Sequence, residues 1–132
     1  MKLSMPFRDI ASKELAKVFA VLSHPDRVRI IEELGSGEKD VNSMQAVLGV
    51  SHSRTSQNLA VLRTNRIVIE RRDGRHVYYR LAQPEFAGWV LEGLRFIERD
   101  LQASGARLTA FEEARQTWSL EQNPELFLTN GD

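Results

Sequence analysis

Cysteine is absent from this chain of 132 residues. Disulfides, thiolate nucleophiles and thiolate metal ligands are therefore excluded. Long hydrophobic runs are also missing, since no stretch approaches the roughly 20 apolar residues that cross a membrane. The N-terminus has no apolar core followed by a small-residue cleavage site. We therefore expect no secretory signal and a cytoplasmic protein.

The residue patterns of common enzyme classes are missing as well. The sequence offers no Ser-His-Asp arrangement, glycine-rich phosphate loop, carboxylate pair or cluster of metal ligands. Its three histidines, His24, His52 and His76, fall in separate predicted elements and are not expected to meet at one ion. We therefore predict that the protein is not an enzyme and has no cofactor and no metal site, although an all-oxygen site stays open.

Charge is distributed unevenly along the chain. Lysine and arginine balance aspartate and glutamate overall, 18 against 18. Residues 51–82, however, carry seven arginines and two acidic residues, whereas residues 83–132 carry four basic and nine acidic ones. A basic segment of this kind is typical of a surface that binds a polyanion. Charge alone does not distinguish such a surface from a solvated basic face.

Apolar residues in the first half follow helical spacing. The spacing predicts helices over residues 10–22, 25–34, 41–48 and 51–64, after a lead-in of residues 1–9 that lacks a period and is expected to be flexible. Asp40 or Asn42 is expected to cap the third helix, Gly49 to end it, and Ser51 to cap the fourth. Two short helices joined by a tight glycine turn form the helix-turn-helix pattern.

The period then changes from helical to alternating. Residues 67–72 are β-branched and then charged, and apolar side chains alternate over residues 75–81. Asp73-Gly74 between them favours a tight turn, so we expect a two-stranded antiparallel hairpin. Tyr79 is expected in the core of this wing and Tyr78 on the opposite side.

Helical spacing returns after Pro84. Gly105 is a candidate break between two helices, and the acidic tail beyond Trp118 is expected to fray. The predicted fold is therefore mainly α with a small β-hairpin, a winged helix-turn-helix with the order α-α-α-α-β-β-α(α).

The start of the fourth helix is rich in short hydrogen-bonding side chains, SHSRTSQN at residues 51–58. A recognition helix needs such side chains at its N-terminal end, where they meet base edges in the major groove. The hairpin tip adds arginines that reach phosphates or the minor groove. We therefore predict a double-stranded DNA-binding site consisting of Ser51, His52, Ser53, Arg54, Ser56, Gln57, Asn58, Arg63, Arg72, Arg75 and Tyr78.

Other arginines have a structural interpretation beside a role at DNA. Arg72, Arg75 and Arg80 are each candidates for protecting exposed hairpin edges, a role that is compatible with DNA contact. Phosphate contact is favoured for Arg72 and Arg75, whereas for Arg80 neither interpretation is favoured. Arg27 and Arg29 are expected to pair with Glu32 or Glu33 on their own helix.

Four segments carry a family resemblance. They are residues 22–31 (LSHPDRVRII), 48–51 (LGVS), 56–62 (SQNLAVL) and 71–81 (RRDGRHVYYRL). In this order they resemble the start of the second helix, the turn, the recognition helix and the wing of the arsenical-resistance repressor (ArsR) family of bacterial metal and stress sensors. The resemblance spans roughly residues 10–102. It implies a homodimer, built from the first and last helices, that binds an imperfect palindrome and represses transcription.

The chain departs from the family at the sensor. The family usually has histidine at the position of Asn58, and many members bind metal through cysteines in the third helix or through Asp and His pairs in the last. This chain has no cysteine, and residues 84–118 contain no histidine. The resemblance therefore implies a member that lacks the usual metal and thiol sensing sites.

The terminal helices carry large apolar residues that a domain of this size cannot cover by itself, and a second copy is the natural partner. The predicted dimer interface consists of Leu15, Val18, Phe19, Leu22, Trp89, Val90, Leu94, Ile97 and Leu101. Trp89, Phe96 and Phe111 are also candidates for lining a small apolar ligand site, so an unidentified effector stays open as a partner.

These predictions divide the chain into a flexible lead-in (1–9), a DNA-binding and dimerisation domain (10–102) and a helical extension with an acidic tail (103–132). The function they favour is that of a sequence-specific, double-stranded DNA-binding transcriptional regulator, acting as a homodimeric repressor. The alternative is a winged-helix protein-interaction module without specific DNA binding, and the basic segment 51–82 argues against it.

Overall fold

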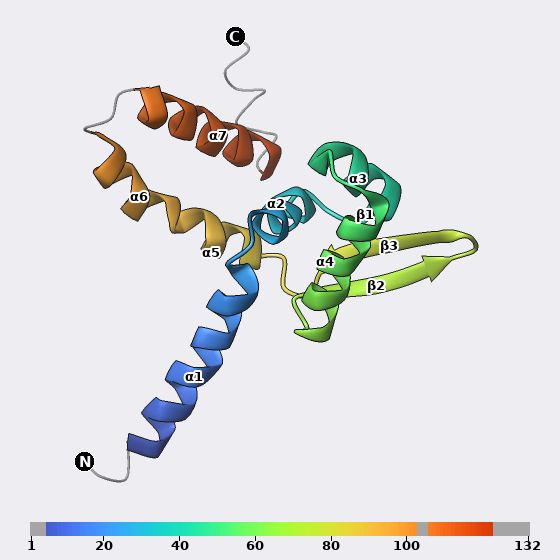
Figure 1. Ribbon diagram of the computed structural model, residues 1–132, viewed down its shortest axis with the longest axis horizontal. Coiled ribbons are helices and arrows are strands. Elements are labelled where there is room, and N and C mark those ends of the chain that lie inside the picture. The colour runs from blue at the N-terminus through green and yellow to red at the C-terminus, as the bar shows by residue number, and fades with distance from the viewer. Residues whose placement is uncertain (1–4, 103–105, 123–132) are drawn as a thin grey trace.

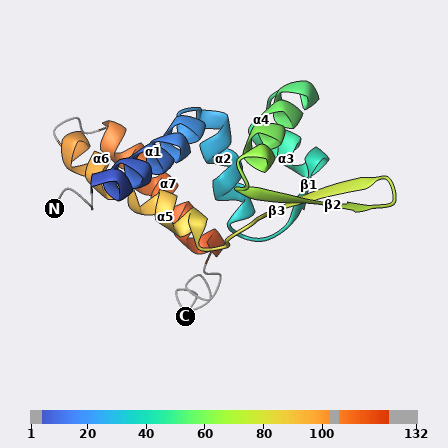
Figure 2. The same ribbon diagram turned by 90° about the horizontal axis from the view of Figure 1, so that it is seen from below.

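The computed structural model describes residues 5–102 and 106–122 and is built mainly of helices (Figure 1). In chain order the elements are α1 (Met5–Leu22), α2 (Pro25–Leu34), β1 (Lys39–Asp40), α3 (Val41–Leu48), α4 (His52–Thr64), β2 (Val68–Asp73), β3 (His76–Leu81), α5 (Phe86–Glu92), α6 (Leu94–Leu101) and α7 (Ala106–Gln122). The β2–β3 hairpin projects as a wing from one end of the molecule, and α1, α6 and α7 lie at the other end (Figures 1 and 2). This is the winged helix-turn-helix fold that the sequence predicts.

Helix α1 begins earlier than expected. Residues 5–9 belong to this helix and not to a flexible lead-in, while residues 1–4 lie outside the described part of the chain. Pro6 is compatible with the early start, because the first turn of a helix has no intrahelical bond for the missing N–H to make. The helix extends away from the body (Figure 1). Its C-terminal end joins the core through Val21 and Leu22.

The core lies between α2, α3, α4 and the sheet. Its fully buried side chains include Ile30 and Ile31 from α2, Met44 from α3, and Leu59 and Leu62 from α4. Burying each such side chain stabilises the fold by about 1.5–3 kcal/mol. The three helices are therefore held in a fixed arrangement, which sets the orientation of α4.

The predicted glycine turn joins α3 to α4. Gly49 has a φ of 67°, a left-handed conformation that other residues rarely adopt. Ser51 caps α4, because its Oγ accepts a hydrogen bond from the Arg54 backbone N–H at 3.1 Å. Asp40, one of the two expected caps of α3, accepts in the same way from the Ser43 N–H at 3.1 Å.

The sheet has three strands, one more than expected. Their order is β1-β3-β2, and both pairings are antiparallel. The β2–β3 hairpin turns at Gly74, which has a φ of 61°, as its sequence predicts. Lys39 and Asp40 add a short strand on the other edge of β3, opposite Tyr79 and Tyr78. A strand of two residues has no alternating pattern, so only the tertiary structure identifies it.

The helices that follow the sheet break at a position that the sequence did not indicate. Gly93 separates α5 from α6 and donates its N–H to the Val90 carbonyl at 3.1 Å, three residues back instead of four. Gly105, the expected break, lies outside the described residues.

Helix α7 continues past Trp118, where fraying is expected. It packs against α6 (Figure 1). An ion pair between Arg115 and Glu98 joins the two helices. No helix within the described ranges is long and apolar enough to cross a membrane.

Candidate nucleic-acid interface

The polar face of α4 carries most of the predicted DNA-binding residues. Thr55, Leu59 and Leu62 are buried against the body, so the opposite side of this helix faces outward. Ser51, His52, Ser53, Arg54 and Gln57 are exposed there, and Ser56 is half-buried. The helix contains no acidic residue. Its N-terminus also carries the positive end of the helix dipole, which favours phosphate.

A groove of about 240 Å³ lies between the start of α4 and the wing. His52 and Ser56 line it from α4, and Arg72, Arg75 and His76 line it from the wing. The structure therefore brings predicted DNA-binding residues from two separate segments to one concave surface. We call the exposed N-terminal half of α4, together with this groove, the α4–wing surface.

Glu70 of β2 binds two of the predicted DNA-binding arginines. Arg63 Nη1 lies 2.5 Å from Glu70 Oε2, and Arg72 Nε lies 3.2 Å from Glu70 Oε1. The hydrogen bond from Arg63 holds the pKa of Glu70 below its ordinary value, and Arg72 contributes less. Arg75 has no ion pair or hydrogen bond with any residue in the part of the chain that the structure describes. Of these arginines, Arg75 is therefore the one whose charge the protein itself does not engage.

The first turn of α2 contacts the recognition helix. Asp26 Oδ2 lies 2.6 Å from Arg54 Nε. Arg27 donates from Nε to Asn58 Oδ1 at 3.1 Å and from Nη1 to the Val21 carbonyl at 3.2 Å. The expected pairing of Arg27 with a glutamate of its own helix is therefore wrong, because its side chain reaches across to α4. Sequence reasoning had no local pattern by which to find either contact.

Asn58 takes part in the hydrogen bonding of the protein itself. Its Oδ1 accepts from Arg27, and its Nδ2 donates to the Arg54 carbonyl at 3.1 Å. The protein thus holds both polar ends of this side chain and leaves one N–H and one oxygen lone pair for other partners. This geometry favours a structural role for Asn58, and its DNA contact stays a prediction.

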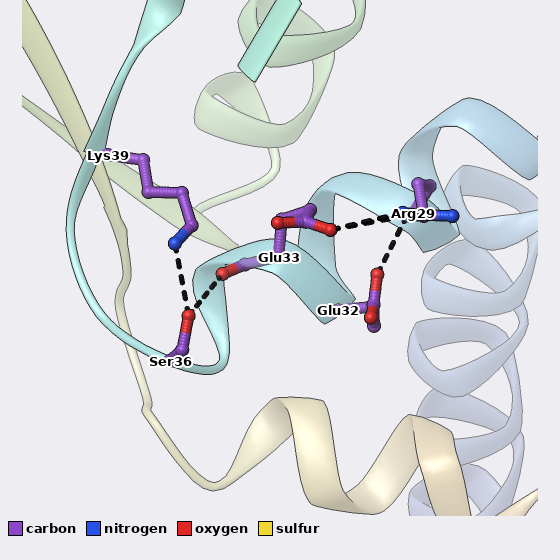
Figure 3. Close-up of polar contacts among 5 residues, drawn as sticks. All are labelled: Arg29, Glu32, Glu33, Ser36 and Lys39. Carbon is purple, nitrogen blue, oxygen red and sulfur yellow. Dashed lines mark hydrogen bonds and ion pairs between the residues drawn. The ribbon is translucent and has the colours of Figure 1, made fainter. Parts of the chain in front are cut away.

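The pairing expected for Arg29 is confirmed (Figure 3). Arg29 Nε lies 2.8 Å from Glu32 Oε2, and its Nη2 lies 3.2 Å from Glu33 Oε1. Both carboxylates are buried, with Glu32 only 4% exposed. Ser36 Oγ donates to the Glu33 carbonyl at 3.0 Å and accepts from Lys39 Nζ at 3.1 Å. This chain of contacts connects α2 to β1 and so helps to place the edge of the sheet.

Arg71 joins the wing to the segment that precedes β1. Its Nη2 lies 2.6 Å from Glu38 Oε1, and its guanidinium carbon lies 4.6 Å from the centre of the Tyr78 ring. The hydrogen bond from Arg71 holds the pKa of Glu38 below its ordinary value. Tyr78, a predicted DNA contact, is half-buried and has this cation over its ring. Tyr79 is buried as predicted, and burial raises the pKa of its hydroxyl.

The predicted dimer residues lie on α1, α5 and α6. Leu15, Phe19, Trp89 and Ile97 are exposed, and Val18, Leu22, Val90, Leu94 and Leu101 are half-buried. The Phe19 and Trp89 rings stack with their centres 6.0 Å apart, which joins the end of α1 to α5. We call the exposed apolar side chains of these helices the terminal apolar face, consisting of Phe7, Ile10, Leu15, Phe19, Trp89, Phe96 and Ile97.

An apolar groove of about 380 Å³ lies on the terminal apolar face. Trp89 and Phe96, two of the three residues considered for a ligand site, line it together with Phe19 and Val90. Phe111 is half-buried on α7 and does not line this groove. The ligand site itself stays a prediction.

The three histidines are divided between two places. His52 and His76 line the α4–wing groove, whereas His24 is the N-cap residue of α2 and makes no side-chain capping bond. Within the described residues, no group of three or more His, Asp or Glu side chains is arranged to hold a metal ion.

Comparison with known proteins defines the class. The sequence profile of bacterial regulatory proteins of the arsR family matches residues 24–70, which include the helix-turn-helix. A biofilm growth-associated repressor from Agrobacterium fabrum is 33% identical over 86 residues, 65% of this chain and 74% of the relative. A transcriptional repressor SmtB homolog from Synechocystis is 39% identical over 71 residues, and the match spans 54% of each chain.

Solved structures agree with this result. The crystal structure of Rv0081 from Mycobacterium tuberculosis superposes with a TM-score of 0.64 at 33% identity, covering 73% of this chain and 97% of that one. The transcriptional repressor BigR from Xylella fastidiosa gives a TM-score of 0.60 at 32% identity, covering 74% and 95%. The fold and the site define a winged helix-turn-helix protein. The chain belongs to the ArsR family, whose members are DNA-binding transcriptional regulators and not enzymes.

Proposed function

We propose that this protein is a homodimeric transcriptional repressor that binds an imperfect palindrome in double-stranded DNA. The observation that carries the proposal is the α4–wing surface. It combines an acid-free recognition helix with a groove lined by Arg72 and Arg75. Polar side chains at the start of the helix suit base edges, and cations beside them suit phosphates.

The terminal apolar face supports the dimer. Its large side chains include Phe96, which is 76% exposed, and the described residues provide no cover for them. An exposed patch of this kind marks an interaction surface. A related winged helix-turn-helix domain from Mycobacterium bovis, 26% identical with a TM-score of 0.58 over 71% of this chain and 85% of that one, is described as homodimeric.

Two copies joined through this face would present two α4 helices. We expect them to enter successive major grooves about 34 Å apart, which requires a palindrome. Repression follows when such a site overlaps a promoter. Because the chain has no cysteine, any effector acts without the family's thiolate ligands.

Selection of bound fragments from genomic DNA tests the proposal. We expect a palindromic site whose affinity falls steeply with salt, because several phosphates are neutralised on binding. Gln57→Ala is expected to cost about 1–3 kcal/mol on that site and to relax the preference at one base step. Gln45→Ala on α3, which is half-buried and outside the α4–wing surface, is the matched control.

Failure to enrich any sequence would contradict the proposal. Weak binding without salt dependence, unchanged by Gln57→Ala, would favour the protein-interaction module instead.

A further inference from the structure

We propose that Asp26 is a positioning residue that presets the Arg54 guanidinium to recognise a guanine. The inference rests on the proposed function, and it assigns a specificity role to a residue of α2 that lies outside the recognition helix. Asp26 would contact no DNA itself. It would act through Arg54.

The geometry of the two side chains is the first observation. Asp26 Oδ2 lies 2.6 Å from Arg54 Nε. The Asp26 side chain is 19% exposed, whereas that of Arg54 is 62% exposed. The carboxylate is therefore the anchored partner, and the guanidinium is the partner that solvent or DNA can reach.

The free edge of the guanidinium is the second observation. Nε is the nitrogen of Arg54 that lies closest to the Asp26 carboxylate, and neither Nη1 nor Nη2 forms an ion pair or hydrogen bond with any described residue other than Asp26. These two nitrogens form the end-on edge of the guanidinium, which matches O6 and N7 of guanine through two parallel hydrogen bonds. A carboxylate bound at Nε leaves that edge available and restricts the rotation of the side chain.

Helix α4 is held at the same place by a second contact. Arg27, next to Asp26, binds Asn58, which lies one turn beyond Arg54 on α4. Asn58 Nδ2 in turn donates to the Arg54 carbonyl. The backbone and the side chain of Arg54 are thus both tied to the first turn of α2. Such restriction lowers the entropy lost on binding and favours the one partner that fits the preset geometry.

A purely structural ion pair is the competing explanation. A pair with one partner this exposed adds little to stability. Its removal would then leave base preference unchanged, which makes the two explanations distinguishable.

A double-mutant cycle on the selected operator tests the inference. The variants are Asp26→Asn, Arg54→Ala and the double substitution, each measured on the operator and on a site in which the base pair read by Arg54 is changed. Arg54→Ala is expected to relax the preference at a guanine. Asp26→Asn is expected to reduce the same preference about tenfold, and to have no further effect once Arg54 is alanine.

Asp9→Asn is the matched control, because Asp9 forms an exposed ion pair with Lys13 at 2.8 Å on α1. It removes the same charge and is expected to leave the guanine preference unchanged. The inference is overturned if Asp26→Asn leaves the preference at its wild-type value, if its effect adds to that of Arg54→Ala, or if Arg54→Ala relaxes a base other than guanine.

A measurement on the wild-type protein covers the case in which Asp26→Asn does not fold. The Arg54 Nε–H resonance, assigned by its loss in Arg54→Ala, is expected to exchange slowly with water in both the free and the DNA-bound protein. Fast exchange in the complex would overturn the inference. A wild-type protein that binds no specific DNA would instead refute the proposed function, so the two failures are distinct.

Discussion

The α4–wing surface and the terminal apolar face differ in how many of their side chains have a partner within the same chain. On the α4–wing surface, Arg54 and Arg72 each have a carboxylate partner within the same chain. On the terminal apolar face, Phe96 and Ile97 remain exposed, and Phe19 meets only the ring of Trp89 among the aromatic contacts described.

The difference has a physical cause. Polar side chains at a DNA-binding surface must be held in one geometry to discriminate bases, and ion pairs within the protomer provide this before DNA arrives. Apolar side chains need no polar partner, because removal of their surface from water is what stabilises them. A second copy of the chain can provide that burial. Under the proposed function, the protomer alone prepares the DNA-binding surface, and a second copy would complete the apolar one.

The largest expected effect comes from a charge placed on the terminal apolar face. Ile97 is 47% exposed on α6, and Ile97→Glu would place an unpaired carboxylate in the proposed dimer interface. Such a buried charge costs about 3–5 kcal/mol. We expect a monomer in sedimentation and a large loss of operator affinity, because half of the contacts are lost.

Val47→Glu provides the control for this experiment. Val47 has nearly the same exposure, 43%, and lies on α3 outside the terminal apolar face. The control is expected to remain dimeric. A dimeric Ile97→Glu protein would show that α6 does not take part in assembly.

A smaller effect should distinguish the two neighbouring residues Gln57 and Asn58. Asn58→Ala leaves Arg27 Nε without its acceptor, so we expect the free energy of unfolding to fall by about 1 kcal/mol. Base preference should change little, whereas Gln57→Ala should change preference and leave stability intact. Chemical denaturation and binding to single-base variants of the operator measure both. Loss of preference in Asn58→Ala at a base other than the one read by Arg54 would instead assign Asn58 a direct contact.

Arg75→Ala should weaken binding to all sequences alike. Arg75 has no partner within the described residues, and its place in the groove suits phosphate. Loss of one phosphate contact is expected to reduce the slope of log affinity against log salt by about 1. Arg80→Ala is the comparison, since Arg80 lies on β3 outside the groove. An unchanged slope in Arg75→Ala would remove the wing tip from the DNA-binding surface.

The smallest effect concerns the acid side of the stability profile. Arg63 lowers the pKa of Glu70 in the folded protein from its ordinary value of 4.5. The stabilisation is therefore complete above pH 4.5 and is lost as the pH falls through the lowered value. Glu70→Gln should lower stability slightly at neutral pH and flatten its decline in acid, as urea unfolding at pH 7 and pH 3.5 would measure. An equally steep decline would assign the acid sensitivity to other groups such as Glu38.

Local sequence patterns determined most of the fold of this protein. Ser51 and Asp40 cap their helices, Gly49 supplies the left-handed turn, and Gly74 closes the hairpin, because each of these residues acts on its immediate neighbours. The same locality explains why the polar start of α4 predicts a recognition helix. The DNA and dimer roles of the individual side chains stay predictions.

Only the tertiary structure decided which side chains meet across elements. Strand β1 exists because residues 39–40 reach a free edge of β3, and two residues carry no period of their own. Arg27 donates a hydrogen bond to Asn58 and does not pair with the glutamates of its own helix. Arg71 likewise binds Glu38. In both cases the packing of the elements brings residues that are distant in sequence within reach. Asp26 likewise meets Arg54 only when α2 lies beside α4. Local propensity sets helices and turns over a few residues, whereas the partner of a long charged side chain depends on how the elements pack.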